Sequence, residues 1–447
     1  MLMKRARLLA LLVMVAFSSF GSAQAAASRA QNQKVVVIHA GRLFDGRSDT
    51  LLSNQIIVIR GGRIAAVGPS ASVKVPAGAK GIDLTHATVI PGLIDAHTHI
   101  FLWPRTRPGG IFLGFDEGFL LNYSWQYRTI EAVVNAKKDL DAGFTSMRDC
   151  SSVGAQYSDV DVRNAINNGL VPGPRLEVAT IPVIGSAWYP LDHPSPEVPV
   201  PQAGFVANSP WAGRAAVRKD VMYGANLIKV FVGGVNIRIR RNGRLWENST
   251  MTTEEAKAIV DEAHRQGVKA ACHAYGGVPL QQSIEAGCDS IELGVDLDSE
   301  SVQKMAQRGM FLVMTVSFMK ALEAHDLQMS HGRGSRAGLQ KASFARALKA
   351  GVKIAFGTDA GAATAHGTQA KEFETMVEYG MTPVQALHAA TTVAAQLMGW
   401  QDRVGSIEPG KYADIDAVSG NPLKDITELE RVKFVMKGGA VVRNDLK

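Results

Sequence analysis

Short apolar stretches alternate with amphipathic segments through most of the chain. Eight of these stretches have the length of buried strands, and segments of helical periodicity lie between them. The segment at 252–267 is typical, because it opens with a threonine cap and early glutamates and closes with a glycine. Strands that alternate with helices favour parallel pairing. The stretches lie at 89–95, 143–149, 175–183, 226–234, 269–276, 288–294, 311–318 and 353–361.

The two ends of the chain show strand patterns without helices. Each contains a hairpin signal, at Gly61-Gly62 and at Gly438-Gly439. We therefore expect an α/β fold, a (β/α)8 TIM-type barrel with a small β-sandwich domain built from both chain ends. An open doubly wound sheet is the alternative, but no glycine-rich phosphate-binding sequence follows the first strand. The predicted domains are a signal peptide at 1–25, a composite β-sandwich at 26–88 and 402–447, and a barrel at 89–401.

The first 25 residues differ from the rest of the chain. Lys4, Arg5 and Arg7 precede an apolar run at 8–17, and an A-x-A sequence ends at Ala25. This pattern is typical of a secretory signal peptide cleaved after Ala25. We expect a periplasmic or secreted protein without a lipid anchor and without membrane insertion, since no cysteine follows the site and no other apolar run is long enough to span a bilayer.

Composition narrows the range of functions. The 447 residues are 46% hydrophobic and 20% charged, which is typical of a globular protein. Cleavage would remove three of the 48 basic residues and leave 45 against 41 acidic ones. So small and scattered an excess argues against nucleic acid as a partner. Three cysteines, Cys150, Cys272 and Cys288, have no framework spacing, and we interpret them as buried small side chains rather than metal ligands.

Polar residues at strand ends suggest a metal site. Alternate side chains of a strand share a face, so His97 and His99 point the same way. Such pairs also occur on solvated strands and in cores, and the pair alone does not decide. Functional residues of this barrel type gather at the carboxyl ends of strands, where Lys229, His273 and Asp359 also lie. Lys229 interrupts a continuous apolar run, so its amine should be neutral, paired with a carboxylate or chemically modified.

Five motifs in order resemble the amidohydrolase superfamily: P-G-L-I-D-A-H-T-H, L-I-K-V-F-V-G-G, H-A-Y-G, F-G-T-D-A-G and G-S-I-E-P-G-K-Y-A-D. They match its imidazolonepropionase-like branch of dipeptidases, prolidases and ochratoxinases. The resemblance implies that Lys229 is carboxylated and bridges two zinc ions. It also implies that His97, His99 and Asp359 hold the first ion, that His273 helps to hold the second, and that the protein assembles into homo-oligomers.

One ligand position departs from this pattern. The sixth strand of relatives typically ends I-E-H-G, whereas this chain reads I-E-L-G with Leu293 in the histidine position. Glu292 is expected to be a poor substitute, because neighbouring strand positions face opposite sides. Three explanations remain: an enzyme with one zinc ion, a weakly filled second site, or a catalytically impaired variant that binds a metal or ligand.

The expected function is metal-dependent hydrolysis of an amide or peptide bond by metal-activated water. Asp359 would transfer the proton, and by resemblance Tyr275 would support the oxyanion, although a structural tyrosine explains that position equally well. The expected substrate carries a carboxylate, as a dipeptide (Xaa-Pro or Xaa-Lys/Arg) or an ochratoxin A-type N-acyl amino acid. A cyclic-amide hydrolase and a structural barrel without metal are the other hypotheses.

Loop residues suggest how a substrate is held. The arginines at 238, 240, 241 and 244 occupy a predicted hairpin that turns at Asn242-Gly243, where one of them would clamp the carboxylate unless the hairpin is simply solvated. His366 follows the eighth strand and is a candidate to reach the pocket. Aromatic residues in two long loops predict an aromatic-lined cavity or, equally, packing of the loops: Phe101, Trp103, Phe112, Phe115, Phe119, Tyr123, Trp125, Trp188 and Tyr189, with His193 beside them.

Overall fold

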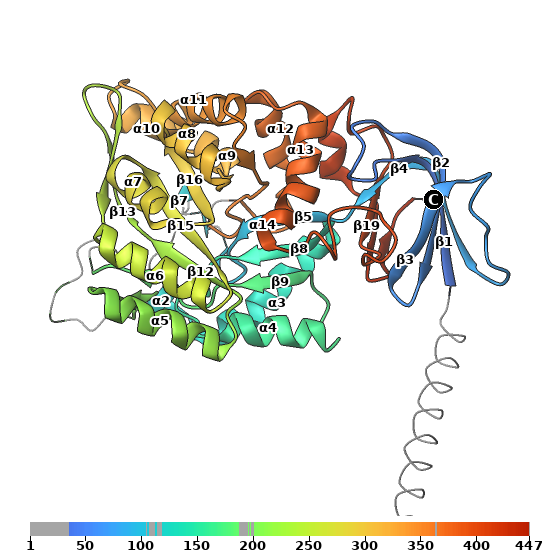
Figure 1. Ribbon diagram of the computed structural model, residues 1–447, viewed down its shortest axis with the longest axis horizontal. Helices are drawn as coiled ribbons and strands as arrows, with labels where there is room; N and C mark the ends of the chain where they lie inside the picture. Colours follow the sequence, from blue (N-terminus) through green and yellow to red (C-terminus); the bar gives the residue numbers. More distant parts are fainter. Residues whose placement is uncertain are drawn as a thin grey trace, which may run out of the picture.

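The computed structural model describes residues 35–103, 105–106, 112–113, 119–186, 195, 197, 201–362 and 364–446. The predicted signal peptide, Phe115 and the loop residues Trp188, Tyr189 and His193 lie outside these residues. Figure 1 shows a sheet formed by both chain ends beside a larger part in which strands and helices alternate.

The sheet of the chain ends has seven strands in the order β21-β20-β19-β4-β1-β2-β3. The N-terminal strands β1 and β4 pair in parallel, and β4 pairs antiparallel with the C-terminal strand β19. Both hairpin predictions are confirmed, since Gly61-Gly62 joins β2 to β3 and Gly438-Gly439 joins β20 to β21. The β-sandwich arrangement stays a prediction. The bounds are β1 Val35–Leu43, β2 Leu52–Arg60, β3 Arg63–Pro69, β4 Lys80–Pro91, β19 Ile415–Val418, β20 Phe434–Lys437 and β21 Ala440–Asn444.

Each of the eight predicted apolar stretches overlaps at least one strand, and these strands, together with β11 outside the stretches, pair in parallel. They form a three-stranded sheet, β5-β8-β9, and a seven-stranded sheet, β11-β10-β12-β15-β16-β17-β18. The residues of β5, β8 and β16 are all buried, as expected for parallel strands covered on both faces. The bounds are β5 Leu93–Thr98, β8 Phe144–Asp149, β9 Arg175–Val178, β10 Val183–Ile184, β11 Phe205–Val206, β12 Leu227–Phe231, β15 Lys269–Gly276, β16 Ser290–Asp296, β17 Phe311–Val313 and β18 Lys353–Ile354.

Helices lie between these strands in sequence, so the predicted α/β class is confirmed. Helix α6 has a capping box in which Thr252 and Glu255 exchange hydrogen bonds, as its sequence predicted. Within the described residues, none of the helices combines the length and apolarity needed to span a bilayer. The helices are α2 Phe119–Asn122, α3 Trp125–Asp141, α4 Ser158–Asn167, α5 Pro210–Tyr223, α6 Thr253–Arg265, α7 Gly277–Ala286, α8 Ser299–Arg308, α9 Val316–Ala321, α10 Glu323–Met329, α11 Arg336–Lys349, α12 Lys371–Glu378, α13 Pro383–His388, η1 Ala389–Val393, α14 Ala394–Met398 and η2 Ile426–Arg431.

Two short hairpins complete the fold. One pairs β13 Gly233–Ile239 with β14 Leu245–Ser249 and turns at Asn242-Gly243, as predicted. The other pairs β6 Arg105–Thr106 with β7 Phe112–Leu113. The first hairpin directly follows β12, so it lies next to the strand that carries Lys229.

Hydrogen bonds also connect the edges of the two parallel sheets. The amide of Ala96 in β5 donates to the carbonyl of Phe356 (2.9 Å), and the amide of His99 donates to the carbonyl of Ala360 (2.8 Å). At the other edge, the amide of Asn226 donates to the carbonyl of Val178 (3.1 Å). These bonds bring the ends of strands that are far apart in sequence to one side of the molecule.

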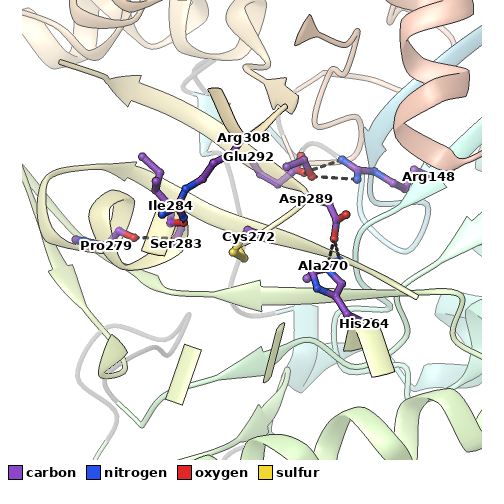
Figure 2. Close-up of a disulfide and its surroundings, with 12 residues drawn as sticks. Arg148, His264, Ala270, Cys272, Pro279, Ser283, Ile284, Asp289, Glu292 and Arg308 are labelled. Carbon is purple, nitrogen blue, oxygen red and sulfur yellow. Dashed lines mark hydrogen bonds and ion pairs between the residues drawn. A yellow bond between two sulfur atoms is a disulfide. The ribbon is translucent and has the colours of Figure 1, made fainter. Parts of the chain in front are cut away.

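The cysteines correct one interpretation. Cys272 in β15 and Cys288 before β16 form a disulfide with a Cα–Cα distance of 6.1 Å (Figure 2), and Cys150 is a buried free thiol. Their spacing of 16 residues carries no sequence signal, because α7 lies between them and the fold brings the two ends together. A loop of this length contributes about 3 kcal/mol in the chain-entropy model.

Candidate metal centre

Three side chains converge where β5 ends and the chain passes β18. Potential ligand atoms of His97, His99 and Asp359 all lie within 4.8 Å of one another. Oδ1 of Asp359 is 3.2 Å from Nε2 of His99 and 3.7 Å from Nε2 of His97. That buried oxygen and Nδ1 of His99 have no hydrogen-bond partner among the described residues. This donor set, one carboxylate and two imidazoles, suits zinc.

The backbone holds the trio in place. The amide of Asp359 donates to the carbonyl of His97 (2.8 Å), which links the two segments directly. The buried carboxylate of Asp95 accepts from the amide of His97 (3.2 Å) and from the hydroxyl of Thr358 (2.6 Å). Asp359 itself has φ +57°, a conformation that costs a non-glycine residue free energy and is common at functional sites.

Glu292 corrects a second expectation. Its carboxylate points to the site, where Oε2 lies 2.7 Å from Nδ1 of His97 and Oε1 accepts from Arg148 (2.6 Å; Figure 2). Leu293 also lines the site, because its left-handed backbone (φ +80°) breaks the alternation of the strand. Burial disfavours the Glu292 carboxylate, but Arg148 and His97 outweigh burial and lower its pKa. Glu292 therefore orients His97 instead of replacing a ligand.

Cys150 does not extend the trio. A ligand set of His97, Cys150 and Glu292 is also compact. However, burial raises the pKa of Cys150 to about 12, so its thiol stays protonated. Glu292 already engages Arg148 and His97.

Lys229 lies next to the trio. It is 1% exposed, and Nζ is 3.3 Å from Nε2 of His97. Among the described residues no carboxylate forms an ion pair with this amine, so the explanation of a simple Lys–carboxylate pair finds no partner there. A buried amine without a counter-charge is costly as an ammonium, and carboxylation would remove that cost.

His273 lines the same cavity but lies outside the compact trio. Its ring packs against the rings of Phe231 (4.8 Å between centroids) and Tyr275 (5.0 Å). Nε2 of His273 is 3.9 Å from Oε1 of the buried Glu247. Leu293 occupies the position where the resemblance implies a second histidine. Its apolar side chain forms the cavity wall there.

Protonation states favour cation binding. Burial and the nearby Lys229 lower the pKa of His97 to about 4 and lower that of His273 well below its ordinary value. Burial opposes ionisation of Asp359, but contact with His99 and the charges of His97 and Lys229 outweigh it and lower its pKa. At neutral pH His97 and His273 are therefore neutral imidazoles and Asp359 is a carboxylate, the forms that bind metal ions.

The cavity has a volume of about 300 Å³. Apolar side chains form much of its wall, including Ile237 and Phe318, and Arg336 also lines the cavity. The guanidinium of Arg336 forks onto Asp326 (2.9 and 2.7 Å), and Arg336 lines the cavity together with Tyr275. An arginine held in this way is preorganised to bind an anion.

The hairpin arginines do not line this cavity. Arg244 pairs with Asp296 (2.7 Å), Arg238 stacks over Trp246 (4.2 Å), and Arg240 and Arg241 are exposed. None of the four is among the residues that line the described cavity, so the clamp stays a prediction without support there.

His366 is likewise structural. It is buried, with Nδ1 2.8 Å from Asp139 and Nε2 3.0 Å from the carbonyl of Leu102. The predicted aromatic loops mostly pack on the protein: Phe101 is in the core and Trp103 packs against Tyr123 (5.8 Å). The aromatic residues that do line the cavity are Phe231, Tyr275 and Phe318.

Three polar residues of the site were missed from the sequence, Arg148, Glu247 and Arg336, and Glu292 was expected on the wrong side of its strand. Arg148 and Glu292 carry the signal that singled out Lys229, since each is a charged residue inside a fully buried strand. Glu247 and Arg336 carry no such signal, because one lies on a hairpin and the other begins α11.

The amidohydrolase family model matches residues 88–442. The chain belongs to the amidohydrolase family. Ochratoxinase from Aspergillus niger is 30% identical to this amidohydrolase, over 92% of the chain and 87% of the ochratoxinase. Imidazolonepropionase from Geobacillus kaustophilus is 24% identical, over 89% of the chain and 92% of that enzyme.

Solved structures agree with this assignment. A Xaa-Pro dipeptidase with methionine bound in its active site has a TM-score of 0.80 and 33% identity, covering 92% of this amidohydrolase and 100% of the dipeptidase. The A. niger ochratoxinase structure has a TM-score of 0.78 and 27% identity, over 93% and 96% of the two chains. The resemblance to the imidazolonepropionase-like branch is confirmed, and these relatives support amide hydrolysis by an enzyme.

Proposed function

We propose that this amidohydrolase uses a divalent metal ion, zinc by its donor set, to hydrolyse an amide bond next to a carboxylate-bearing group. The convergence of His97, His99 and Asp359 around a buried oxygen without a hydrogen donor among the described residues carries this proposal. These residues fit the ion, since two imidazoles and one carboxylate bring ligand atoms to one place. A carboxylated Lys229 would add an anionic oxygen ligand where its amine now lies beside His97.

The residues of the site have distinct roles in this proposal. When bound, the ion lowers the pKa of water and polarises the carbonyl under attack. Asp359 Oδ1 accepts the proton of the attacking water and returns it to the departing nitrogen. Burial raises the pKa of Tyr275, so its hydroxyl stays protonated and donates to the developing oxyanion. Leu293 and Phe318 exclude bulk water from the cavity.

Arg336 supports the substrate class. A carboxylate bound to its guanidinium would place the rest of a small acyl amino acid across the cavity towards the trio. The names of the relatives, Xaa-Pro dipeptidase and ochratoxinase, support a dipeptide or an ochratoxin A-type N-acyl amino acid. The name imidazolonepropionase keeps a cyclic amide as the competing substrate class.

Leu293 favours a second candidate function, a metal or ligand-binding variant with little turnover. Without an imidazole at position 293, the His273 side has fewer protein ligands than zinc sites usually have. This candidate predicts bound zinc without hydrolysis of any amide in the panel described next.

The test combines metal analysis with substrate selectivity. Zinc per chain and hydrolysis rates would be measured for N-acyl amino acids, their carboxamide analogues, dipeptides and a cyclic amide. The double variant Arg336→Gln/Asp326→Asn avoids a lone buried carboxylate, and Arg333→Leu serves as an exposed control on the same segment. We expect the double variant to lose roughly 10- to 100-fold in kcat/KM for the acids only, because charge-assisted hydrogen bonds contribute about 1.5–3 kcal/mol. Equal loss for acids and carboxamides would contradict the carboxylate assignment.

Four further points are part of the proposal. The hydrogen bonds between β5 and the segment at 355–360 support a closed (β/α)8 barrel, with domains at 26–88 plus 402–447 and at 89–401. The Cys272–Cys288 disulfide supports an oxidising location, in line with a cleaved signal peptide at 1–25 and a periplasmic or secreted protein. The proposed partners are a small-molecule or dipeptide substrate and further copies of this chain in a homo-oligomer.

A further inference from the structure

Glu247 has a free carboxylate oxygen inside the protein. Its side chain is fully buried on β14, and Oε2 accepts from the amides of Tyr275 (2.8 Å) and Gly276 (3.2 Å). The other oxygen, Oε1, has no hydrogen-bond partner among the described residues. It lies 3.9 Å from Nε2 of His273. A buried carboxylate oxygen without a donor is costly, so this arrangement needs a reason.

The backbone around Glu247 makes room for this orientation. Gly233 lies on the paired strand β13, and a Cβ at that position would approach Oε1 to 1.9 Å. Any side chain at 233 would therefore displace the carboxylate. The two amides fix one oxygen, and the glycine leaves the other free to face His273.

On the His97 side of the cavity, a histidine and a buried carboxylate are already hydrogen-bonded to each other. There Nδ1 of His97 is 2.7 Å from the buried carboxylate of Glu292, which leaves Nε2 to face Asp359. Metal-binding histidines usually hold a carboxylate or carbonyl through their second nitrogen. His273 and Glu247 are placed in a similar way with the ring nitrogens exchanged, but their separation of 3.9 Å is longer than a hydrogen bond, so one side chain must move closer to form it.

We propose that Glu247 is the positioning residue of His273, accepting the Nε2 proton at Oε1 so that Nδ1 presents its lone pair to the cavity. This inference rests on the proposed metal-dependent function. It explains how the ligand on the His273 side of the cavity is held in place. Orientation matters more on this side because Leu293 supplies no second imidazole. A direct role of Glu247 as a ligand fits less well, since among the described residues no third His, Cys, Asp or Glu completes a compact set with it and His273.

The tautomer of His273 provides a test that does not depend on activity. Full-length protein with ¹⁵N-labelled histidine would be treated with a chelator and examined by NMR at pH 9, well above the ordinary pKa of histidine, so that the neutral tautomers are observed. A His273→Gln variant assigns the signals. We expect His273 of the wild-type protein to be the Nε2–H tautomer. Finding its Nδ1–H tautomer in the wild type would overturn the proposal.

Glu247→Gln keeps the shape and reverses the hydrogen bond. The glutamine carbonyl stays on the two amides and its NH₂ group faces Nε2, which must then accept. We expect this variant to switch His273 to the Nδ1–H tautomer and to bind the second zinc ion roughly 10- to 100-fold more weakly, measured by calorimetric titration of the metal-free protein. Asp416→Asn is the matched control, because Asp416 is also buried with one oxygen on an amide (Leu93, 3.1 Å) and the other without a partner among the described residues.

The outcomes separate this inference from the proposed function. An unchanged tautomer in Glu247→Gln would overturn the inference even if the enzyme is active. The expected tautomers in a protein that never binds zinc would support the pairing and reject the metal-dependent function. Zinc coordinated by Glu247 in a crystal structure of the loaded protein would also overturn the positioning role.

Discussion

The two sides of the cavity differ in how completely they are built. On the His97 side, two imidazoles and Asp359 lie within 4.8 Å, and Glu292 with Arg148 supports them from behind. On the His273 side, one imidazole faces the cavity, the wall is apolar at Leu293, and the supporting carboxylate of Glu247 stays at 3.9 Å. One side is ready to bind an ion, whereas the other depends on a single imidazole.

A single strand causes much of this difference. β16 sends Glu292 to support His97 and places Leu293 on the wall beside His273. Both side chains reach the site because Leu293 adopts φ +80°. This backbone occurs with leucine at position 293, so the strand geometry does not need a metal-binding side chain there.

Asp359→Asn should have the largest effect on activity. Proton transfer contributes about 10²- to 10⁴-fold, and the variant also loses an anionic ligand, so we expect kcat to fall by about 10³-fold or more. His273→Gln should lower kcat less if the His97 side carries the reaction. Initial rates and zinc content of both variants check this order, and equal losses would remove the distinction between the two sides.

Glu292→Gln should have the largest effect on stability. It leaves the buried guanidinium of Arg148 without its ion pair, which costs about 3–5 kcal/mol for pairs of this kind. Urea unfolding measures the loss. Asp416→Asn removes a buried carboxylate that forms no ion pair among the described residues, and we expect it to cost less. A similar cost for both would mean that Arg148 and Glu292 are not a stabilising pair.

Leu293→His should strengthen the weaker side. The added imidazole supplies a second nitrogen donor on the His273 side, and we expect the second zinc ion to bind at least about tenfold more tightly. Leu293→Asn is the control, because asparagine tolerates positive φ but offers no imidazole. Zinc per chain after dialysis against fixed free zinc distinguishes the two variants. Identical zinc content would show that position 293 is not part of the second site.

His366→Gln should have the smallest effect and depend on pH. Burial opposes charge on His366, but Asp139 outweighs it and raises its pKa above 6.5. A raised pKa stabilises the folded protein fully below the ordinary value, and this contribution is lost as pH rises through the folded-state pKa. The difference in unfolding free energy between wild type and variant should therefore shrink upwards from pH 6.5. Asp139→Asn should remove the same pH dependence.

Much of this fold could be predicted because its patterns are local. The alternation of apolar stretches identified all the strands of the two parallel sheets except the short β11, and glycine pairs marked two hairpin turns. The spacing of His97 and His99 placed both on one face of β5. Lys229 was found because charge inside a buried run is unusual. Each of these signals needs only neighbouring residues and the period of a strand.

The remaining features depend on contacts that no local pattern contains. Glu292 seemed to face away from the site because the rule of alternation holds only while φ stays in the extended region, and Leu293 leaves it. The disulfide joins cysteines whose approach is decided by how α7 packs between two strands. Arg336 reaches the cavity from the start of α11, a position that the sequence alone does not relate to the strand ends.

By itself, the amino-acid sequence determined the α/β class, the family and the candidate ligands, since periodicity and motifs are written along one chain. Tertiary structure alone decided which carboxylate supports which imidazole, which arginine faces the substrate cavity, and how unevenly its two sides are built. The physical reason is that electrostatic and hydrogen-bond contacts act over a few ångströms in space, and folding brings together residues more than a hundred positions apart.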